Sequence, residues 1–113
     1  MLPSSQKVSR SLFKPIMLKG RRYASTSFNA IFFDSNQAGK PKFSVVVPKK
    51  VEKSAVRRNY MKRAVYSSVR GLLKGVRPGV ACIIFMKKKV ERADFKGLND
   101  EVSVFLKKTL SIL

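Results

Sequence analysis

Residues 54–70, SAVRRNYMKRAVYSSVR, combine cationic and hydrogen-bonding side chains and contain no acidic residue. At 3.6 residues per helical turn, four of these residues share one face and a fifth lies next to it. They are Asn59, Arg63, Tyr66 and Arg70, with Lys62 beside them. Asn59 can hydrogen-bond a phosphate or a base edge, and Tyr66 offers a ring for stacking among the cations. The spacing therefore predicts a helix that binds RNA with one face.

The same stretch has a second, apolar face that predicts how the helix is held. The members of this face recur with the helical period and are Met61, Val65, Ser68, Val69 and Leu72. Such a stripe is typical of a helix docked on a sheet, which leaves the cationic face toward solvent. In an average protein a basic stripe is more often only a solvated face, but solvated faces normally pair opposite charges at i,i+4. Like charges stacked without an acid favour an anionic partner.

The charge of the whole chain supports a nucleic-acid partner. The 113 residues include 25 Lys and Arg against 6 Asp and Glu and no histidine, a formal net charge of +19. Such a chain repels itself and attracts polyanions. The 44% hydrophobic content excludes a fully disordered basic tail and suits one domain over residues 1–113, with 1–9 expected to be flexible. No apolar stretch approaches the ~20 residues of a membrane span, so no membrane partner is expected.

The chain is poor in catalytic side chains. It has no histidine, and its single cysteine, Cys82, lies in the apolar run VACIIF, which predicts a buried and inert thiol. The acids are scattered singly, so no triad, paired-carboxylate site or metal cluster is expected. We therefore predict no catalytic residue, no metal or cofactor held by side chains alone, and no small-molecule substrate. An autonomous nuclease is not expected.

Strand patterns precede the basic helix. SFNAIFF and KFSVVVP are β-rich runs joined by DSNQAGKP, whose residues favour turns, and together they predict an antiparallel pair. Alternation gives the first strand two faces, of which only one can be core if the other lines a cleft. One face carries Phe28, Ala30 and Phe32, and the other carries Asn29, Ile31 and Phe33.

The remaining segments complete an α/β sandwich with one sheet. The basic helix should end near Lys74, and RPG at 77–79 turns the chain into GVACIIFM, a run typical of a strand covered on both faces. Asp94 is the expected N-cap of a C-terminal amphipathic helix. The apolar positions of that helix are Phe95, Leu98, Val102, Phe105, Leu106, Leu110 and Leu113. The expected order is helix, two or three strands, helix, strand, helix.

The N-terminal 27 residues allow two interpretations. They are Ser-rich, contain Arg and lack acids, as organelle transit peptides do. Against import, LFKPIMLKG at 12–20 reads as a short helix of the folded domain, with Pro15 in its first turn and Gly20 as its stop. The second interpretation is favoured, and the transit peptide remains the alternative.

The order of these motifs resembles the protein subunit of bacterial ribonuclease P over nearly the whole chain. The pieces that carry the resemblance are Phe13, Gly20 with Arg21, VVVPKKV at 45–51, AVRRNYMKR at 55–63 and ACIIFMKK at 81–88. The resemblance implies an αβββαβα fold with one central sheet and a left-handed crossover around the basic helix. It also implies a bacterial cytoplasmic protein.

The resemblance further implies a subunit that does not cut RNA. In that family an RNA partner holds Mg²⁺ and hydrolyses precursor tRNA to remove its 5′ leader, so the implied partners are a catalytic RNA and precursor tRNA. Carried over by position, the contacts to the catalytic RNA are Arg58, Asn59, Lys62, Arg63 and Arg70, with Lys49 and Lys50 beside them. Charge and helical position add Lys53, Arg57 and Tyr66. The residues expected near the leader are Phe13, Ile31, Phe33 and Lys87, with Lys88 next in the chain.

Some positions depart from that family's pattern. Tyr66 and Ser67 stand where the family usually has Arg-Glu, and Met17 and Ile31 stand where aromatic residues often stack on leader bases. These departures predict a cleft that holds the leader by shape and charge more than by stacking. For any single Phe, core packing is the more frequent role, and the lysines at 87–89 could serve only to keep the strand end soluble.

Two other classes share part of this pattern. A structural RNA-binding protein, such as a small ribosomal protein, would have the same charge and α/β character but not the order of the lysine pair and AVRRNYMKR. A protein that binds a membrane surface would need an exposed apolar face beyond what the core requires. The co-purifying RNA would distinguish the first alternative.

Overall fold

The computed structural model of the chain describes residue 8, residues 10–34 and residues 41–110. Its helices and strands follow the expected αβββαβα order. They are α1 (Arg10–Lys19), β1 (Arg21–Ala24), β2 (Phe28–Asp34), β3 (Lys42–Val46), α2 (Ala55–Leu72), β4 (Val80–Met86) and α3 (Phe95–Phe105). A 3₁₀ turn, Leu73–Gly75, extends α2, and a π-helical turn, Leu106–Leu110, extends α3. Residues 1–9, expected to be flexible, lie outside the described part except for Val8, which is buried.

The four strands form one sheet in the order β1-β2-β4-β3. β2 pairs with β4 in antiparallel register, with Ile31 opposite Ile83, and β3 pairs with β4 in parallel, with Val45 opposite Ile84. The predicted antiparallel pair of β2 and β3 is wrong, because each of them flanks β4. An apolar central strand needs a neighbour on both edges, and the chain places β3 on the far edge through the crossover helix α2.

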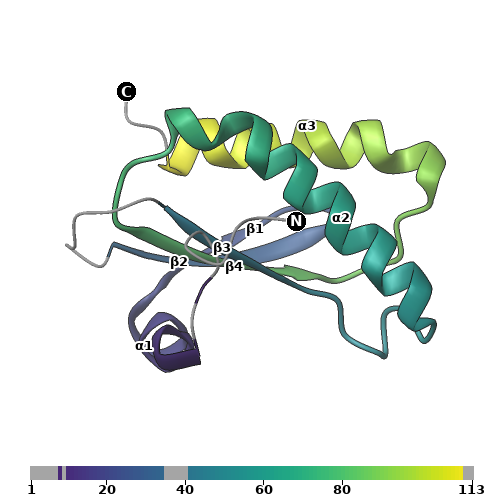
Figure 1. Cartoon of the computed structure of the whole chain (residues 1–113), viewed down its shortest axis with the longest axis horizontal. Coiled ribbons are helices and arrows are strands. Elements are labelled where there is room, and N and C mark those ends of the chain that lie inside the picture. Colours follow the sequence, from purple (N-terminus) through teal and green to yellow (C-terminus); the bar gives the residue numbers. More distant parts are fainter. Residues whose placement is uncertain (1–7, 9, 35–40, 111–113) are drawn as a thin grey trace.

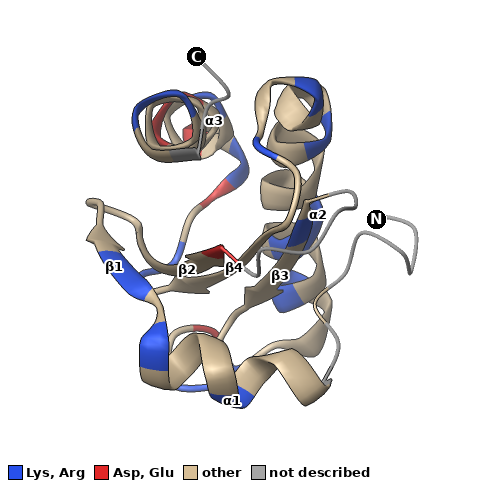
Figure 2. Cartoon of the chain, turned by 90° about the vertical axis from the view of Figure 1, so that its left-hand side faces the viewer, with Lys and Arg blue, Asp and Glu red and all other residues tan. Residues whose placement is uncertain are grey.

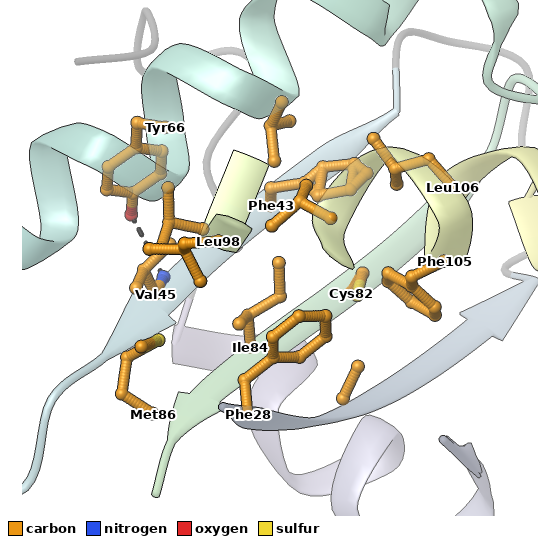
Figure 3. Packing of buried hydrophobic residues seen from close by; sticks show 14 of the residues in the cluster. Phe28, Phe43, Val45, Tyr66, Cys82, Ile84, Met86, Leu98, Phe105 and Leu106 are labelled. Carbon is orange, nitrogen blue, oxygen red and sulfur yellow. Dashed lines mark hydrogen bonds between the residues drawn. The ribbon is translucent and has the colours of Figure 1, made fainter. Parts of the chain in front are cut away.

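The helices cover the two faces of the sheet unequally, as Figures 1 and 2 show. α2 and α3 lie side by side on one face and contact each other, whereas α1 lies on the opposite face. The face under α2 and α3 carries the larger core, shown in Figure 3, to which Phe28, Phe43 and Phe105 each contribute a fully buried ring. The face under α1 carries a small core of five buried residues, which are Val8, Ile16, Ile31, Ala81 and Ile83.

The alternation of β2 distributes its side chains between these two cores. Phe28, Ala30 and Phe32 join the larger core, and Ile31 joins the small core. β4 is buried on both faces along almost its whole length, as its apolar run predicts. Cys82, at the centre of β4, is fully buried, and burial raises the pKa of its thiol, so this cysteine is a packing residue.

Local sequence accounts for the ends of α2. Ser54 is the N-cap, with extended backbone, and its Oγ accepts the N–H of Arg57 at 3.3 Å. Beyond α2 and the 3₁₀ turn that follows it, Gly79 has φ 80°, a left-handed conformation that glycine adopts without strain, and it turns the chain into β4. Asp94 occupies the N-cap position of α3 but makes no capping hydrogen bond with its side chain.

The start of α1 differs from the sequence prediction. The helix begins at Arg10, so Pro15 lies in its second turn and not in the first. Gly20 ends the helix as expected, and its N–H donates to the Ile16 carbonyl at 2.8 Å. A Cβ at Gly20 would collide with that carbonyl oxygen and lie 2.5 Å from Cγ2 of Ile31. The absence of a side chain at Gly20 therefore allows α1 to end directly against β2.

Candidate RNA-binding surfaces

The outer face of α2 carries most of the predicted RNA contacts. Asn59, Arg63 and Arg70 are exposed there, and Lys62 is half-buried beside them. The opposite stripe docks on the larger core through Met61, Val65 and the residues that follow at helical spacing, as predicted. With no acid in the helix, the hydrogen-bond donors on this face suit phosphate oxygens.

Tyr66 was predicted to stack on RNA, and the structure contradicts this role. The residue is only 6% exposed, and its hydroxyl accepts the N–H of Val45 at 3.1 Å, as Figure 3 shows. β3 is an edge strand with β4 on one side only, and the Tyr66 hydroxyl gives one of its backbone donors a partner. The buried sector of α2 is wide enough to include Tyr66 next to Val65, so the ring belongs to the core.

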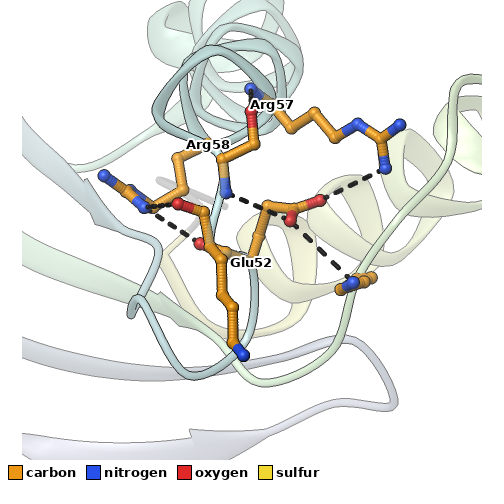
Figure 4. A network of polar contacts seen from close by, with 6 residues as sticks. Glu52, Arg57 and Arg58 are labelled. Carbon is orange, nitrogen blue, oxygen red and sulfur yellow. Dashed lines mark hydrogen bonds and ion pairs between the residues drawn. The ribbon is translucent and has the colours of Figure 1, made fainter.

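A turn rich in lysine leads into α2 and extends the cationic surface. Lys49, Lys50 and Lys53 are exposed along it. Arg58 stabilises this turn because its Nη1 donates to the carbonyls of Glu52 and Lys53, at 3.0 and 2.9 Å (Figure 4). These two hydrogen bonds fix the position of its guanidinium at the start of α2.

A groove of ≈ 480 Å³ lies on the sheet face that α1 covers only in part. It is lined by Met17, Arg22, Tyr23, Ala24, Asn29, Ala30, Ile31 and Phe85. Ile31, predicted to contact the leader, is only 4% exposed and contributes to the groove wall from the small core. Lys87 lies close to the groove, because its Nζ donates to Oδ1 of Asn29 at 3.3 Å.

The other residues predicted near the leader lie outside this groove. Phe13 and Phe33 are half-buried and pack against the small core. Lys88 is exposed, and its charge helps to lower the pKa of Glu101 on α3, so it lies toward the opposite side of the sheet from α1. Of the five predicted residues, the groove therefore brings together Ile31 and, through Asn29, Lys87.

Sequence reasoning missed part of the groove. Arg22 comes from β1, a four-residue strand without a recognisable alternating pattern, and it pairs in the sheet with Ile31. Asn29 and Phe85 are opposite each other in the β2–β4 register. The one sequence feature that indicated a groove here is the polar Asn29 on the Ile31 face of β2. A fully buried face would rarely contain an asparagine that has no hydrogen-bond partner.

The groove combines apolar walls with cationic and amide donors, a set that suits single-stranded nucleic acid. Arg22 and Lys87 supply positive charge, and no acidic residue lines the groove. Among the described residues, no three His, Cys, Asp or Glu side chains are grouped so that they could hold a metal ion. None of the helices in the described part is long and apolar enough to cross a membrane.

Fold and surfaces together define a small, strongly basic α+β protein with a cationic helix face and a separate open groove. Comparison with known proteins gives the family. The sequence matches the ribonuclease P family model over residues 3–110. The chain therefore belongs to the ribonuclease P protein family, the protein components of a tRNA-processing ribonucleoprotein.

Two curated relatives support this assignment, and two solved structures share the fold. The ribonuclease P protein component of Pseudanabaena sp. (strain PCC 6903) is 32% identical over 110 residues, which cover 96% of this chain and 94% of the relative. That of Caldanaerobacter subterraneus subsp. tengcongensis is 31% identical over 97 residues, covering 86% and 82%. The RNase P protein of Thermotoga maritima has a TM-score of 0.79 at 24% identity, covering 90% and 96%. That of Staphylococcus aureus has a TM-score of 0.79 at 18% identity, covering 94% and 95%.

Proposed function

We propose that this protein binds the catalytic RNA of ribonuclease P and the 5′ leader of precursor tRNA, and so assists removal of the leader. The observation that carries the proposal is the exposed face of α2, where Asn59, Lys62 and Arg63 lie in one row without an acid. Such a face releases counterions when it meets a phosphate backbone, which makes RNA binding strong and salt-dependent. In this proposal the α2 face and the turn carrying Lys49, Lys50 and Lys53 contact the catalytic RNA.

The groove under α1 is proposed as the site for the leader. It is open, it carries Arg22 and Lys87 at its walls and mouth, and its apolar floor can hold the faces of unpaired bases. Met17, 41% exposed, provides a flexible apolar surface where a stacking ring would be more selective. The groove would therefore hold several leader sequences with similar affinity.

The chemical step is proposed to reside in the RNA partner with Mg²⁺. The chain contains no histidine, and its one cysteine is buried in β4. Three of its six acids are engaged in structural contacts, Glu52 and Asp34 in ion pairs and Glu101 with two serines. The protein would act in the cytoplasm of a bacterium by positioning RNA.

Reconstitution tests this proposal. RNA-free protein incubated with precursor tRNA and Mg²⁺ should leave the substrate intact, and adding a bacterial ribonuclease P RNA should yield the mature 5′ end. The protein should also lower the Mg²⁺ concentration that the RNA requires, because it supplies cationic contacts. Processing by nuclease-treated protein without added RNA would overturn the proposal. Recovery of the protein with ribosomal RNA in a ribosomal subunit would favour the structural alternative.

A further inference from the structure

A second pocket lies between the beginning of α2 and the segment that joins β4 to α3. Its volume is ≈ 300 Å³, at the lower end of the range for sites that hold small organic groups. The residues that line it are Glu52, Arg57, Tyr60, Met61, Lys89, Val90, Glu91, Arg92 and Phe95. None of these residues lines the groove under α1.

The pocket contains an acid that is almost fully buried. The side chain of Glu52 is only 7% exposed. Its Oε2 accepts the N–H of Ser54 at 3.3 Å and lies 3.9 Å from Nζ of Lys89, whereas Oε1 lies 3.8 Å from Nη1 of Arg57 (Figure 4). At 3.8 Å the Arg57 guanidinium is an ion-pair neighbour of Oε1 and lies beyond hydrogen-bond distance of it. A carboxylate accepts up to about four hydrogen bonds, so this one has capacity for further donors in the pocket.

The rest of the lining supplies an aromatic surface and cations. Tyr60 on α2 is 54% exposed, which is unusual for a ring that could pack on the core, and Phe95 at the start of α3 is half-buried. Arg57 and Lys89 form ion pairs with the buried acid, and Arg92 lines the same pocket. The pocket thus offers ring faces, a hydrogen-bond acceptor at depth and a net positive charge at its edge, where three exposed cations outnumber the one exposed acid, Glu91.

We propose that this pocket binds a guanine base, either unpaired in an RNA chain or as a free nucleotide. Guanine presents two adjacent donors, N1–H and the N2 amino group, which match the two oxygens of a carboxylate, whereas adenine presents one amino group on that edge. Tyr60 and Phe95 would contact the faces of the base, and Arg57, Lys89 or Arg92 would pair with its phosphate. The RNA-borne source rests on the proposed function, since it would fix one guanine of the catalytic RNA or of its substrate.

The first arm of the test compares ligands on the RNA-free, isotope-labelled full chain. Titrations with GMP, AMP, inorganic phosphate and the tetranucleotides UUGU and UUAU are followed by nuclear magnetic resonance. GMP and UUGU should shift the signals of Tyr60, Arg92 and Phe95 and bind about tenfold more tightly than AMP and UUAU, as expected for a two-bond contact to a base edge. Tighter binding of UUGU than of GMP would identify RNA as the source, and equal binding would identify the free nucleotide.

Three variants separate the contributions within the pocket. Glu52→Gln should reduce the tenfold preference for guanine to about equal binding, because the amide offers one acceptor and adds a donor. Tyr60→Ala should weaken GMP and AMP alike and, at an exposed position, should leave the fold intact, while Tyr60→Phe should retain binding. Val56→Ala is the matched control, because Val56 is 65% exposed on the same helix and does not line the pocket.

The proposal is overturned if guanine and adenine bind equally to the unaltered chain. It is also overturned if GMP shifts the same signals as inorganic phosphate and leaves Tyr60 and Phe95 unmoved. Stimulation of precursor-tRNA processing in the same preparation separates the two ideas. Full stimulation of processing without a guanine preference would rule out guanine binding in the pocket and leave the proposed function standing. A guanine preference without stimulation of processing would contradict the proposed function and leave guanine binding standing.

Discussion

The two faces of the sheet differ in how completely the helices cover them. The face under α2 and α3 carries three fully buried Phe rings in the larger core. In the described part of the chain, the ten residues of α1 and Val8 cover the other face, and a groove remains open beside Met17 and Asn29. The incomplete cover by α1 thus leaves the groove open, while the larger core under α2 and α3 holds α2 in place.

The first way to break this comparison is to remove one ring from each face. Phe105→Ala should lower the free energy of unfolding by about 3–5 kcal/mol, because the ring is fully buried and contacts Tyr23, Phe28 and Phe32. Phe13→Ala should cost only about 1–2 kcal/mol, because part of its ring stays in water. Urea denaturation measures both. Equal losses would mean that the two faces contribute alike to stability.

The next largest effect on stability is expected at Tyr66, whose ring packs in the larger core under α2 and α3. Tyr66→Phe removes the acceptor of the Val45 N–H and should lower the free energy of unfolding by about 1–3 kcal/mol, the cost of a buried donor without a partner. The salt dependence of RNA binding should stay unchanged. If the variant were as stable as the unaltered chain but bound RNA more weakly, Tyr66 would have to contact RNA, and its assignment to the core would be wrong.

The smallest effect is expected at Glu101, which fastens α3 to the loop between β1 and β2. Its carboxylate accepts hydrogen bonds from both hydroxyls of Ser25 and Ser27 and from the Ser27 N–H, at 2.6 to 2.9 Å. Burial alone would raise the pKa of Glu101, but these bonds and the charge of Lys88 lower it overall. Much of the group is in contact with water, so solvent screens its contribution.

The sign of the pH dependence follows from the lowered pKa. The stability that Glu101 contributes is present above its ordinary pKa of 4.5 and is lost as pH falls through the lower, folded-state value. Glu101→Gln should therefore be less stable than the unaltered chain at pH 7, and the difference should shrink toward pH 3. Urea denaturation at several pH values checks this. A constant difference would assign the contribution to packing.

The comparison of the two faces also explains what the sequence could predict. The uniform apolar run of β4 and the helical stripe of α2 are local patterns, and both predict burial correctly. β3 pairs with β4, which comes much later in the chain, after the crossover helix α2. The turn residues between β2 and β3 therefore predicted the wrong partner, β2. Tyr66 has both an apolar ring, which suits the core, and a polar hydroxyl, which suits an exposed surface. It is buried because the edge strand β3 places the Val45 N–H within reach of that hydroxyl.

The groove was only partly predictable for a related reason. The Ile31 face of β2 could be recognised from alternation, but Arg22 and Phe85 join it through strand pairing between distant segments. Nothing local to the lysine run distinguishes Lys87, which bonds to Asn29, from Lys88, which lies near Glu101. Tertiary placement alone separates these neighbours.

The most direct test of the central claim, that α2 and the groove bind different RNAs, compares Arg63→Ala with Lys87→Ala in the reconstituted particle. Arg63→Ala should reduce the slope of log affinity for the catalytic RNA against log salt by roughly one unit. It should affect precursors with long and very short leaders equally. Lys87→Ala should leave that slope unchanged and weaken binding only of the precursor with a long leader. If both variants instead weaken the same step with the same dependence on leader length, the two surfaces do not have separate roles and the claim is contradicted.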